Sequence, residues 1–188
     1  VQDFLEECLS DALNGKTEDE VIQKIKDFKE YFKTLDPWKK GMPKRANNIT
    51  MYTKKYNRQM KAPGDNYRLY KLDKLKDETE NKMIPGHVRA SINWNNLKYA
   101  NSDNYSLTIM DGAKVVVCRL KSNPMNYTSI AYPTDELNLP DWFKELPFDE
   151  EGMEEAVLDK KIKNVLGVMG WDLSRANDSK VMDAFFEF

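Results

Sequence analysis

The sequence predicts an α+β fold, in which a helical base and further helices accompany a small antiparallel β hairpin or sheet. Two observations lead to this class. Apolar residues follow the helical period over the first third of the chain and again after residue 141. Between these parts, residues 106–132 carry β-branched runs around Asp111-Gly112, a dipeptide typical of hairpin turns.

The first third of the chain predicts two helices that pack as a hairpin. Apolar residues follow the helical period over residues 1–13, and Gly15 ends this segment. Residues 17–20, with the sequence Thr-Glu-Asp-Glu, form a capping box that starts a second helix. Its apolar stripe covers residues 21–35 and stops before Pro37, because the residue before a proline is disfavoured in a helix.

The middle of the chain is less regular. Asn47 or Asn48 is the expected cap of a short helix that runs through Ile49, Tyr52 and Tyr56. After Pro85-Gly86, apolar positions over residues 88–97 predict a third helix, although three asparagines, which are poor helix formers, lie within it.

The β structure is expected between residues 106 and 132. Residues 107–110 and 114–120 flank the Asp111-Gly112 turn, and we expect these two runs to pair as a hairpin. Residues 127–132 are the expected third strand, which Pro133 ends.

Helical periodicity then returns. It predicts a short helix over residues 142–146 and a longer one over residues 157–169 that closes near Gly170. The polar stretch from Ser174 to Lys180 is the expected tether to an apolar tail. We therefore expect one domain over residues 1–173, followed by the tether and tail over residues 174–188.

Charge is distributed unevenly, although the net charge is only −2. Residues 38–98 carry fifteen basic and five acidic side chains, whereas residues 133–188 carry six and fourteen. Between Trp38 and Pro63, basic and aromatic residues alternate without any acidic residue, a composition that suits a nucleic-acid-binding surface. The alternative is a solvated basic face that pairs with the acidic ends of the same protein.

The last residues are unusually apolar for a chain end, which is normally polar and frayed. Their spacing is typical of a one-turn helix that inserts one aliphatic residue and a pair of aromatic residues into a shallow pocket. Tails that dock on sliding clamps, the rings that encircle DNA, have this pattern, although Ser179 stands where such tails usually have Gln. The alternative is that the tail folds back on its own core. The residues concerned are Met182, Phe185, Phe186 and Phe188.

No catalytic set assembles from the sequence. Cys8, Cys118 and the single histidine, His87, form neither a zinc set nor a nucleophile–base pair. A phosphate-binding loop and a carboxylate pair for magnesium ions are also absent, and the acidic run at residues 149–155 is interpreted as a solvated loop and helix start. We expect no cofactor in this chain, no membrane partner, and a reducing, cytoplasmic setting.

Six segments, in order along nearly the whole chain, resemble segments of one protein family, the family B replicative DNA polymerases of T-even-like phages, in their C-terminal thumb domain. These segments are Val1-Gln2-x-x-Leu5-Glu6-Glu7, Lys44-Arg45-Ala46-Asn47-Asn48-Ile49-x-x-Tyr52, Pro85-Gly86-His87-Val88-Arg89, Met110-Asp111-Gly112-Ala113-Lys114-Val115, Asn123-Pro124 with Ile130-Ala131-Tyr132-Pro133, and the C-terminal tail.

The resemblance implies a thumb-like fold that holds the primer–template duplex by its phosphates and recognises its shape rather than its sequence. Five of the implied contacts, at Lys44, Asn47, Tyr52, His87 and Arg89, are expected to converge on one concave face. Two departures matter, because Thr128 stands where the family has a lysine and Gly86 where it has an aromatic residue. His87 has the alternative of being a buried core histidine. The implied DNA contacts are Lys44, Arg45, Asn47, Tyr52, Lys82, His87, Arg89 and Lys160.

The resemblance also implies a role. The chain would be the non-catalytic portion of a DNA polymerase, a nucleotidyltransferase whose Mg²⁺ ions and catalytic residues belong to other domains. Its expected partners are duplex DNA, the remaining polymerase domains and, through the tail, the sliding clamp, in the cytoplasm of an infected bacterium. The start at Val1 indicates a piece of a longer chain or a separately encoded subunit. The alternative function is an interaction module of another phage replication or assembly protein.

Overall fold

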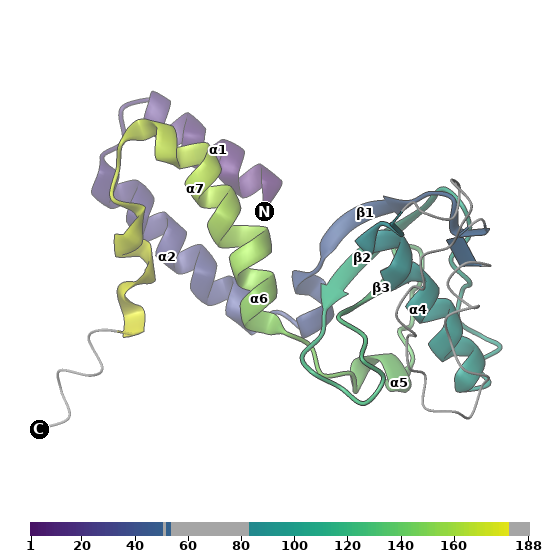
Figure 1. The fold of residues 1–188 in the computed structure, drawn as a ribbon. Coiled ribbons are helices and arrows are strands. Elements are labelled where there is room, and N and C mark those ends of the chain that lie inside the picture. The colour runs from purple at the N-terminus through teal and green to yellow at the C-terminus, as the bar shows by residue number, and fades with distance from the viewer. Residues whose placement is uncertain (51, 54–82, 181–188) are drawn as a thin grey trace, which may run out of the picture. The chain divides into compact units, whose positions relative to one another are not determined.

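The fold is described from a computed structural model, for residues 1–50, 52–53 and 83–180. These residues form helices and a small antiparallel sheet (Figure 1), so the predicted mixed α and β class is confirmed. The chain divides into two units. Val1–Lys40 with Glu151–Phe188 form the helical unit, and Gly41–Glu150 form the sheet unit. The sequence did not predict this division, and the boundary expected after residue 173 stays a prediction.

Both N-terminal helices are confirmed. Helix α1 spans Gln2–Leu13 and α2 spans Glu18–Thr34, followed by the short 3-10 helix η1 over Pro37–Lys40. The capping box is present: the Glu20 amide donates to Thr17 Oγ1 at 3.3 Å, and the Thr17 amide donates to Glu20 Oε2 at 2.8 Å. Each partner satisfies a backbone N–H that the first turn of a helix leaves free.

The long C-terminal helix is also present, with one irregularity. It consists of α6 (Glu150–Glu154), a π-helical turn η2 (Glu155–Asp159), α7 (Lys160–Leu166) and a 3-10 turn η3 (Gly167–Met169). Gly170 closes it with a φ of +71°, a left-handed conformation that glycine adopts at little cost. Within the described ranges, no helix combines the length and apolar character needed to cross a membrane.

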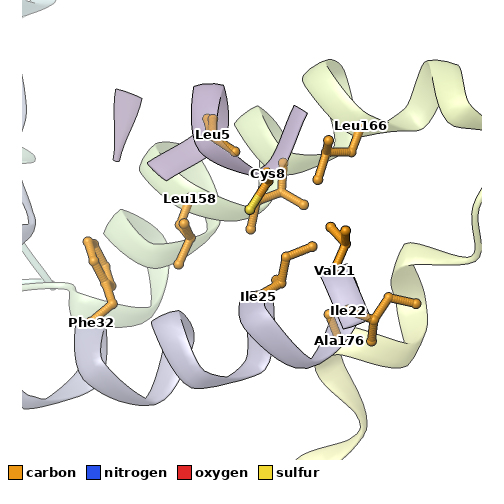
Figure 2. Packing of buried hydrophobic residues seen from close by; sticks show 10 residues of the cluster. Leu5, Cys8, Val21, Ile22, Ile25, Phe32, Leu158, Leu166 and Ala176 are labelled. Atoms are coloured by element: carbon orange, nitrogen blue, oxygen red, sulfur yellow. The ribbon is translucent and has the colours of Figure 1, made fainter. Parts of the chain in front are cut away.

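The core of the helical unit brings the two ends of the chain together (Figure 2). Leu5 and Cys8 of α1 and Ile25 of α2 pack with Leu158 of η2 and Leu166 of α7, and all five are almost completely buried. The predicted packing of α1 with α2 is therefore confirmed, and α7 completes the bundle. Burial of these side chains removes apolar surface from water, which is the main stabilising contribution in such a bundle.

Leu173–Lys180 forms a 3-10 helix, η4, that is held against α2. Ala176 is buried in the core, and Arg175 pairs with Asp19 at 2.7 Å. Lys29, itself buried, pairs with Asp159 at 2.5 Å and also donates to Asn177. The sequence predicted a tether from residue 174, whereas these contacts anchor residues 173–177 to the helical unit.

The sheet has three antiparallel strands in the order β1-β2-β3, namely Met42–Ala46, Ala113–Arg119 and Ser129–Pro133. The predicted third strand is confirmed as β3. The predicted hairpin is wrong, because β2 pairs with β1 and residues 107–110 form no strand. The Asp111-Gly112 turn itself is present: Gly112 has a φ of +82°, and the Ala113 amide donates to the Met110 carbonyl at 3.1 Å.

The hairpin fails because helix α4, Gly86–Ala100, holds residues 107 and 109 through their backbone groups. The Asn95 side chain donates to the Ile109 carbonyl and accepts from the Ile109 amide, both at 2.9 Å. Trp94 Nε1 donates to the Leu107 carbonyl at 2.8 Å. With these groups bonded to α4, the segment lies along the helix and does not pair with β2. Helix α4, predicted over residues 88–97, is confirmed.

Strand β1 approaches β2 so closely that its preceding residue must be glycine. A Cβ atom on Gly41 would lie 2.5 Å from Val116 Cγ1 and 2.8 Å from the Val117 carbonyl oxygen. The second distance involves backbone, which cannot move aside without breaking the strand pairing. Gly41 therefore permits the β1–β2 pairing that the sequence did not reveal.

An aspartate organises the loop after α4. Asp103 accepts hydrogen bonds from the amides of Tyr105 and Ser106, from Ser106 Oγ, and from Trp142 Nε1 of α5 (Asp141–Lys144), at 2.6–3.0 Å. Burial alone would raise the pKa of Asp103, but these hydrogen bonds outweigh burial and hold that pKa well below its usual range. The carboxylate thus fixes the loop to α5.

We predict that Asp103→Ala lowers the free energy of unfolding at pH 7 by about 2–3 kcal/mol, the usual effect of losing hydrogen bonds to a charged group. A carboxyl with a depressed pKa stabilises the fold above the unfolded pKa near 3.8 and loses this effect as the pH falls through its folded pKa. The difference between wild type and variant in urea unfolding should therefore shrink below about pH 4. A difference that is constant with pH would contradict this role.

Candidate nucleic-acid interface

The basic residues of the predicted DNA contact at 44–45 lie on strand β1, at the edge of the sheet. Pro43 is tolerated there because it need not donate to a neighbouring strand on the open edge. Lys44 and Arg45 are both exposed. An edge strand with proline and two cations resists pairing with another strand, so its side chains remain available to other ligands.

Successive side chains of a strand point to opposite faces, so Lys44 and Arg45 diverge. Lys44 shares its face with Ala46 and with its pairing partner Val115, both completely buried, and it lies at the margin of this buried face. Arg45 lies on the other face beside Lys114, its partner in β2, which is also exposed. The edge of the sheet therefore presents positive charge on both of its faces.

His87 lies in the first turn of α4 and is half-buried. Burial lowers its pKa, and the positive charge of Lys44 lowers it further. The effect indicates that two predicted contacts, far apart in the sequence, lie close enough for their charges to interact. The N-terminus of α4 has no side-chain cap, and backbone N–H groups at such an end favour negative charge.

The five side chains expected to converge do not all share one face. Arg89 is two positions after His87, and two residues are separated by roughly 200° around a helix, so they point to opposite sides of α4. Tyr52 is only 8% exposed and belongs to the core. Asn47 is exposed directly after β1. Of the five, Lys44 and His87 lie close enough for the charge of Lys44 to lower the His87 pKa.

The chain leaves β1 through an interaction with the Asp111-Gly112 turn. Asn48 has a φ of +61°, and its carbonyl accepts from the Tyr52 amide at 3.1 Å, so it occupies the predicted cap position. The carboxylate of Asp111 accepts from the Thr50 amide at 3.3 Å. Asp111 thus serves one first-turn amide of the helical residues that begin at Ile49.

Several predicted residues cannot be placed at this edge. Lys82 lies outside the described residues, as do the tail residues Met182, Phe185, Phe186 and Phe188. Lys160 is exposed in α7 of the helical unit and lies 3.4 Å from Glu155, so its charge is partly offset locally. It belongs to a different unit from Lys44.

Basic side chains are treated differently in the two units. In the helical unit, many are paired with carboxylates, among them Lys16, Lys24, Lys29, Lys33, Lys39 and Arg175. By contrast, Lys44, Arg45, Arg89 and Lys114 form no salt bridge with a described carboxylate of their own sheet unit, although Arg119 of that unit lies 3.6 Å from Asp149. The alternative of a basic face paired with the acidic ends of the protein stays a prediction.

Lys114 is the residue that sequence reasoning missed. Its position beside Arg45 depends on the β1–β2 register, and the sequence predicted a different partner for β2. A detectable signal was the short run Met42–Ala46 after a glycine, which has the length of an edge strand. The sheet unit as a whole carries seventeen basic and thirteen acidic residues, whereas the helical unit carries twelve and eighteen.

The described ranges contain neither a metal-binding cluster nor a cysteine activated as a thiolate. No group of three or more histidine, cysteine, aspartate or glutamate side chains there could hold a metal ion. Burial raises the pKa of the Cys8 thiol to about 11 and that of Cys118 to about 12, so both thiols are protonated at neutral pH.

A comparison with protein-family models finds no match, and a search of curated proteins finds no similar sequence.

We predict that the pKa of His87, the only histidine of the chain, lies below 6.5 in an NMR titration, because burial and Lys44 both disfavour the charged imidazolium. Lys44→Ala should raise this pKa part of the way back. Arg89→Ala, on the opposite side of α4, is the matched control and should leave it unchanged. Equal shifts in both variants would show that Lys44 has no specific effect on the imidazole.

Proposed function

We propose that this chain is the thumb portion of a phage-type family B DNA polymerase and that its sheet unit holds duplex DNA by the phosphate backbone. The proposal combines two independent supports. The first is the order of six family-like segments along the sequence. The second is the basic edge, defined here as Lys44, Arg45, Lys114 and His87, in which the two lysines and the arginine carry charges suited to phosphates and His87 is a neighbouring polar group.

The observation that carries the proposal is the lack of carboxylate partners for Lys44, Arg45 and Lys114 among the described residues of the sheet unit. Surface cations that already pair with carboxylates gain less from a phosphate, because a pair must be broken first. Cations without such partners displace the counterions that are condensed on DNA, and the release of these counterions drives binding. The chemistry is therefore that of phosphate contact.

The composition of the basic edge also suits binding that does not depend on base sequence. Arg45 offers a planar fork of donors that fits a phosphate, whereas Lys44 contributes a mobile point charge. Phosphates attract both cations whatever the base sequence. A polymerase that moves along DNA needs contacts that do not depend on base sequence.

We predict that Lys44→Ala weakens binding to all duplex sequences alike and flattens the plot of log K against log salt concentration by about one unit, because one phosphate contact is lost. Lys39→Ala is the matched control, since Lys39 is exposed but paired with Asp36 at 2.7 Å in the helical unit. Fluorescence anisotropy with labelled duplexes of two unrelated sequences measures both effects.

Two outcomes of this experiment would count against the proposal. If the wild-type chain has no measurable affinity for duplex DNA even at low salt, the interaction-module alternative is favoured. If Lys39→Ala and Lys44→Ala change the salt slope equally, the binding is a general property of surface lysines and not of the basic edge.

The proposal extends to the tail, which lies outside the described residues. We predict that the double variant Phe185→Ala, Phe186→Ala abolishes binding to a sliding clamp, because the aromatic pair is the proposed anchor. Its melting temperature should stay close to wild type, since aromatic residues buried in the fold would cost about 3–5 kcal/mol. Differential scanning calorimetry, paired with a clamp-binding assay, would expose a tail that is instead part of the core.

A further inference from the structure

Two loops of the sheet unit lie side by side. The first covers residues 99–107, from the last turn of α4, and the second covers residues 134–142, from the end of β3 to α5. The Leu107 amide donates to Glu136 Oε2 at 2.6 Å, and Trp142 Nε1 donates to Asp103 Oδ2 at 2.9 Å. These two hydrogen bonds join the loops into one surface, which we call the loop surface.

Large apolar side chains are exposed on the loop surface. Tyr105 is 98% exposed, Leu137 93%, Tyr99 71% and Leu107 45%. The hydrogen bond between Leu107 and Glu136 places Leu107 next to the residue that precedes Leu137. Single exposed apolar residues are common, but several on two joined loops mark an interaction site.

The loop surface is mainly acidic. The two loops contain Asp103, Asp135, Glu136 and Asp141, and basic residues flank them only at Lys98 and Lys144. Asp135 and Asp141 are exposed, and Asp103 is ionised because its pKa is well below the usual range. Carboxylates at this density repel phosphates, so the loop surface does not suit nucleic acid.

The exposed tyrosine is held on a rigid backbone. The carboxylate of Asp103 accepts from the Tyr105 amide at 2.9 Å and from the Ser106 amide at 3.0 Å, and it is itself fixed by Trp142. A binding residue on a backbone that is already ordered loses little conformational entropy when a partner docks. The backbone of Tyr105 is thus held in place while its side chain is exposed. Because the side chain is not buried, it adds little to the stability of the fold.

We propose that the loop surface binds a second protein, through a segment of that protein in which apolar side chains are flanked by lysines or arginines. Apolar side chains on the partner would cover Tyr105, Leu137, Tyr99 and Leu107. Its cations would face Asp135 and Asp141, and this complementarity would select it over acidic surfaces. The proposal is independent of DNA binding, because it uses none of the residues of the basic edge.

The test uses the full chain and two synthetic probes, a fourteen-residue peptide of leucine and lysine and a matched peptide of leucine and glutamate. The double variant Tyr105→Ser, Leu137→Ser should weaken binding of the lysine peptide by about tenfold or more, as loss of a central aromatic anchor does. The control variant Leu13→Ser, Val168→Ser removes two apolar side chains that are 73% and 79% exposed in the acidic helical unit. It should bind like wild type, and the glutamate peptide should not bind.

Three results would overturn the proposal. The lysine peptide could fail to bind the wild-type chain, or both double variants could lose the same affinity, which would indicate general attraction to acidic protein. The third concerns the chain's own residues 54–82, which contain nine basic side chains. If p-benzoylphenylalanine placed at position 105 cross-links to residues 54–82 in the purified protein, the occupant of the loop surface is this segment and not a second protein.

Discussion

The hydrogen bonds between α4 and residues 107–110 are the interaction on which the sheet unit depends. Asn95 satisfies both backbone groups of Ile109, and Trp94 satisfies the carbonyl of Leu107. This segment therefore lies along the helix, and the edge of β2 that it leaves open is taken by Met42–Ala46. The same choice brings Lys44 and Arg45 from an irregular stretch of sequence onto an ordered strand. Two side-chain contacts of one helix thus decide where the cations of the candidate interface lie.

Charge pairing distinguishes the two units more clearly than composition does. In the helical unit, lysines alternate with carboxylates on helix surfaces and meet them at short range, as Lys24 does with Glu7 and Asp11. Such pairs contribute little to stability when exposed, but they neutralise the surface. On the sheet edge, strand alternation sends Lys44 and Arg45 to opposite faces, and neither forms a salt bridge with a described carboxylate of the sheet unit. In the helical unit, several pairs join different elements, because packing of α1, η2 and η4 against α2 brings oppositely charged side chains together.

The sheet unit carries two surfaces of opposite charge. The basic edge is built from β1, β2 and the start of α4, whereas the acidic and apolar loop surface is built from the end of α4 and the approach to α5. Helix α4 has fifteen residues and is about 22 Å long, so the end that carries His87 lies far from the end that carries Tyr99. The two surfaces adjoin at one point, where the Thr134 amide donates to the Lys114 carbonyl at 3.0 Å.

The sequence by itself determined the elements whose signals are local. The capping box at Thr17, the apolar stripe of α2, the Asp111-Gly112 turn and the strand before Pro133 all depend on neighbours within a few residues. Only the tertiary structure decided which strands pair, that Tyr52 is buried, and that Lys44 lies near His87 while Arg89 points away. The physical reason is that strand pairing is a competition among distant segments for the same backbone groups. Here the outcome depended on the side chains of Trp94 and Asn95. In the sequence, Asn95 was interpreted only as a poor helix former.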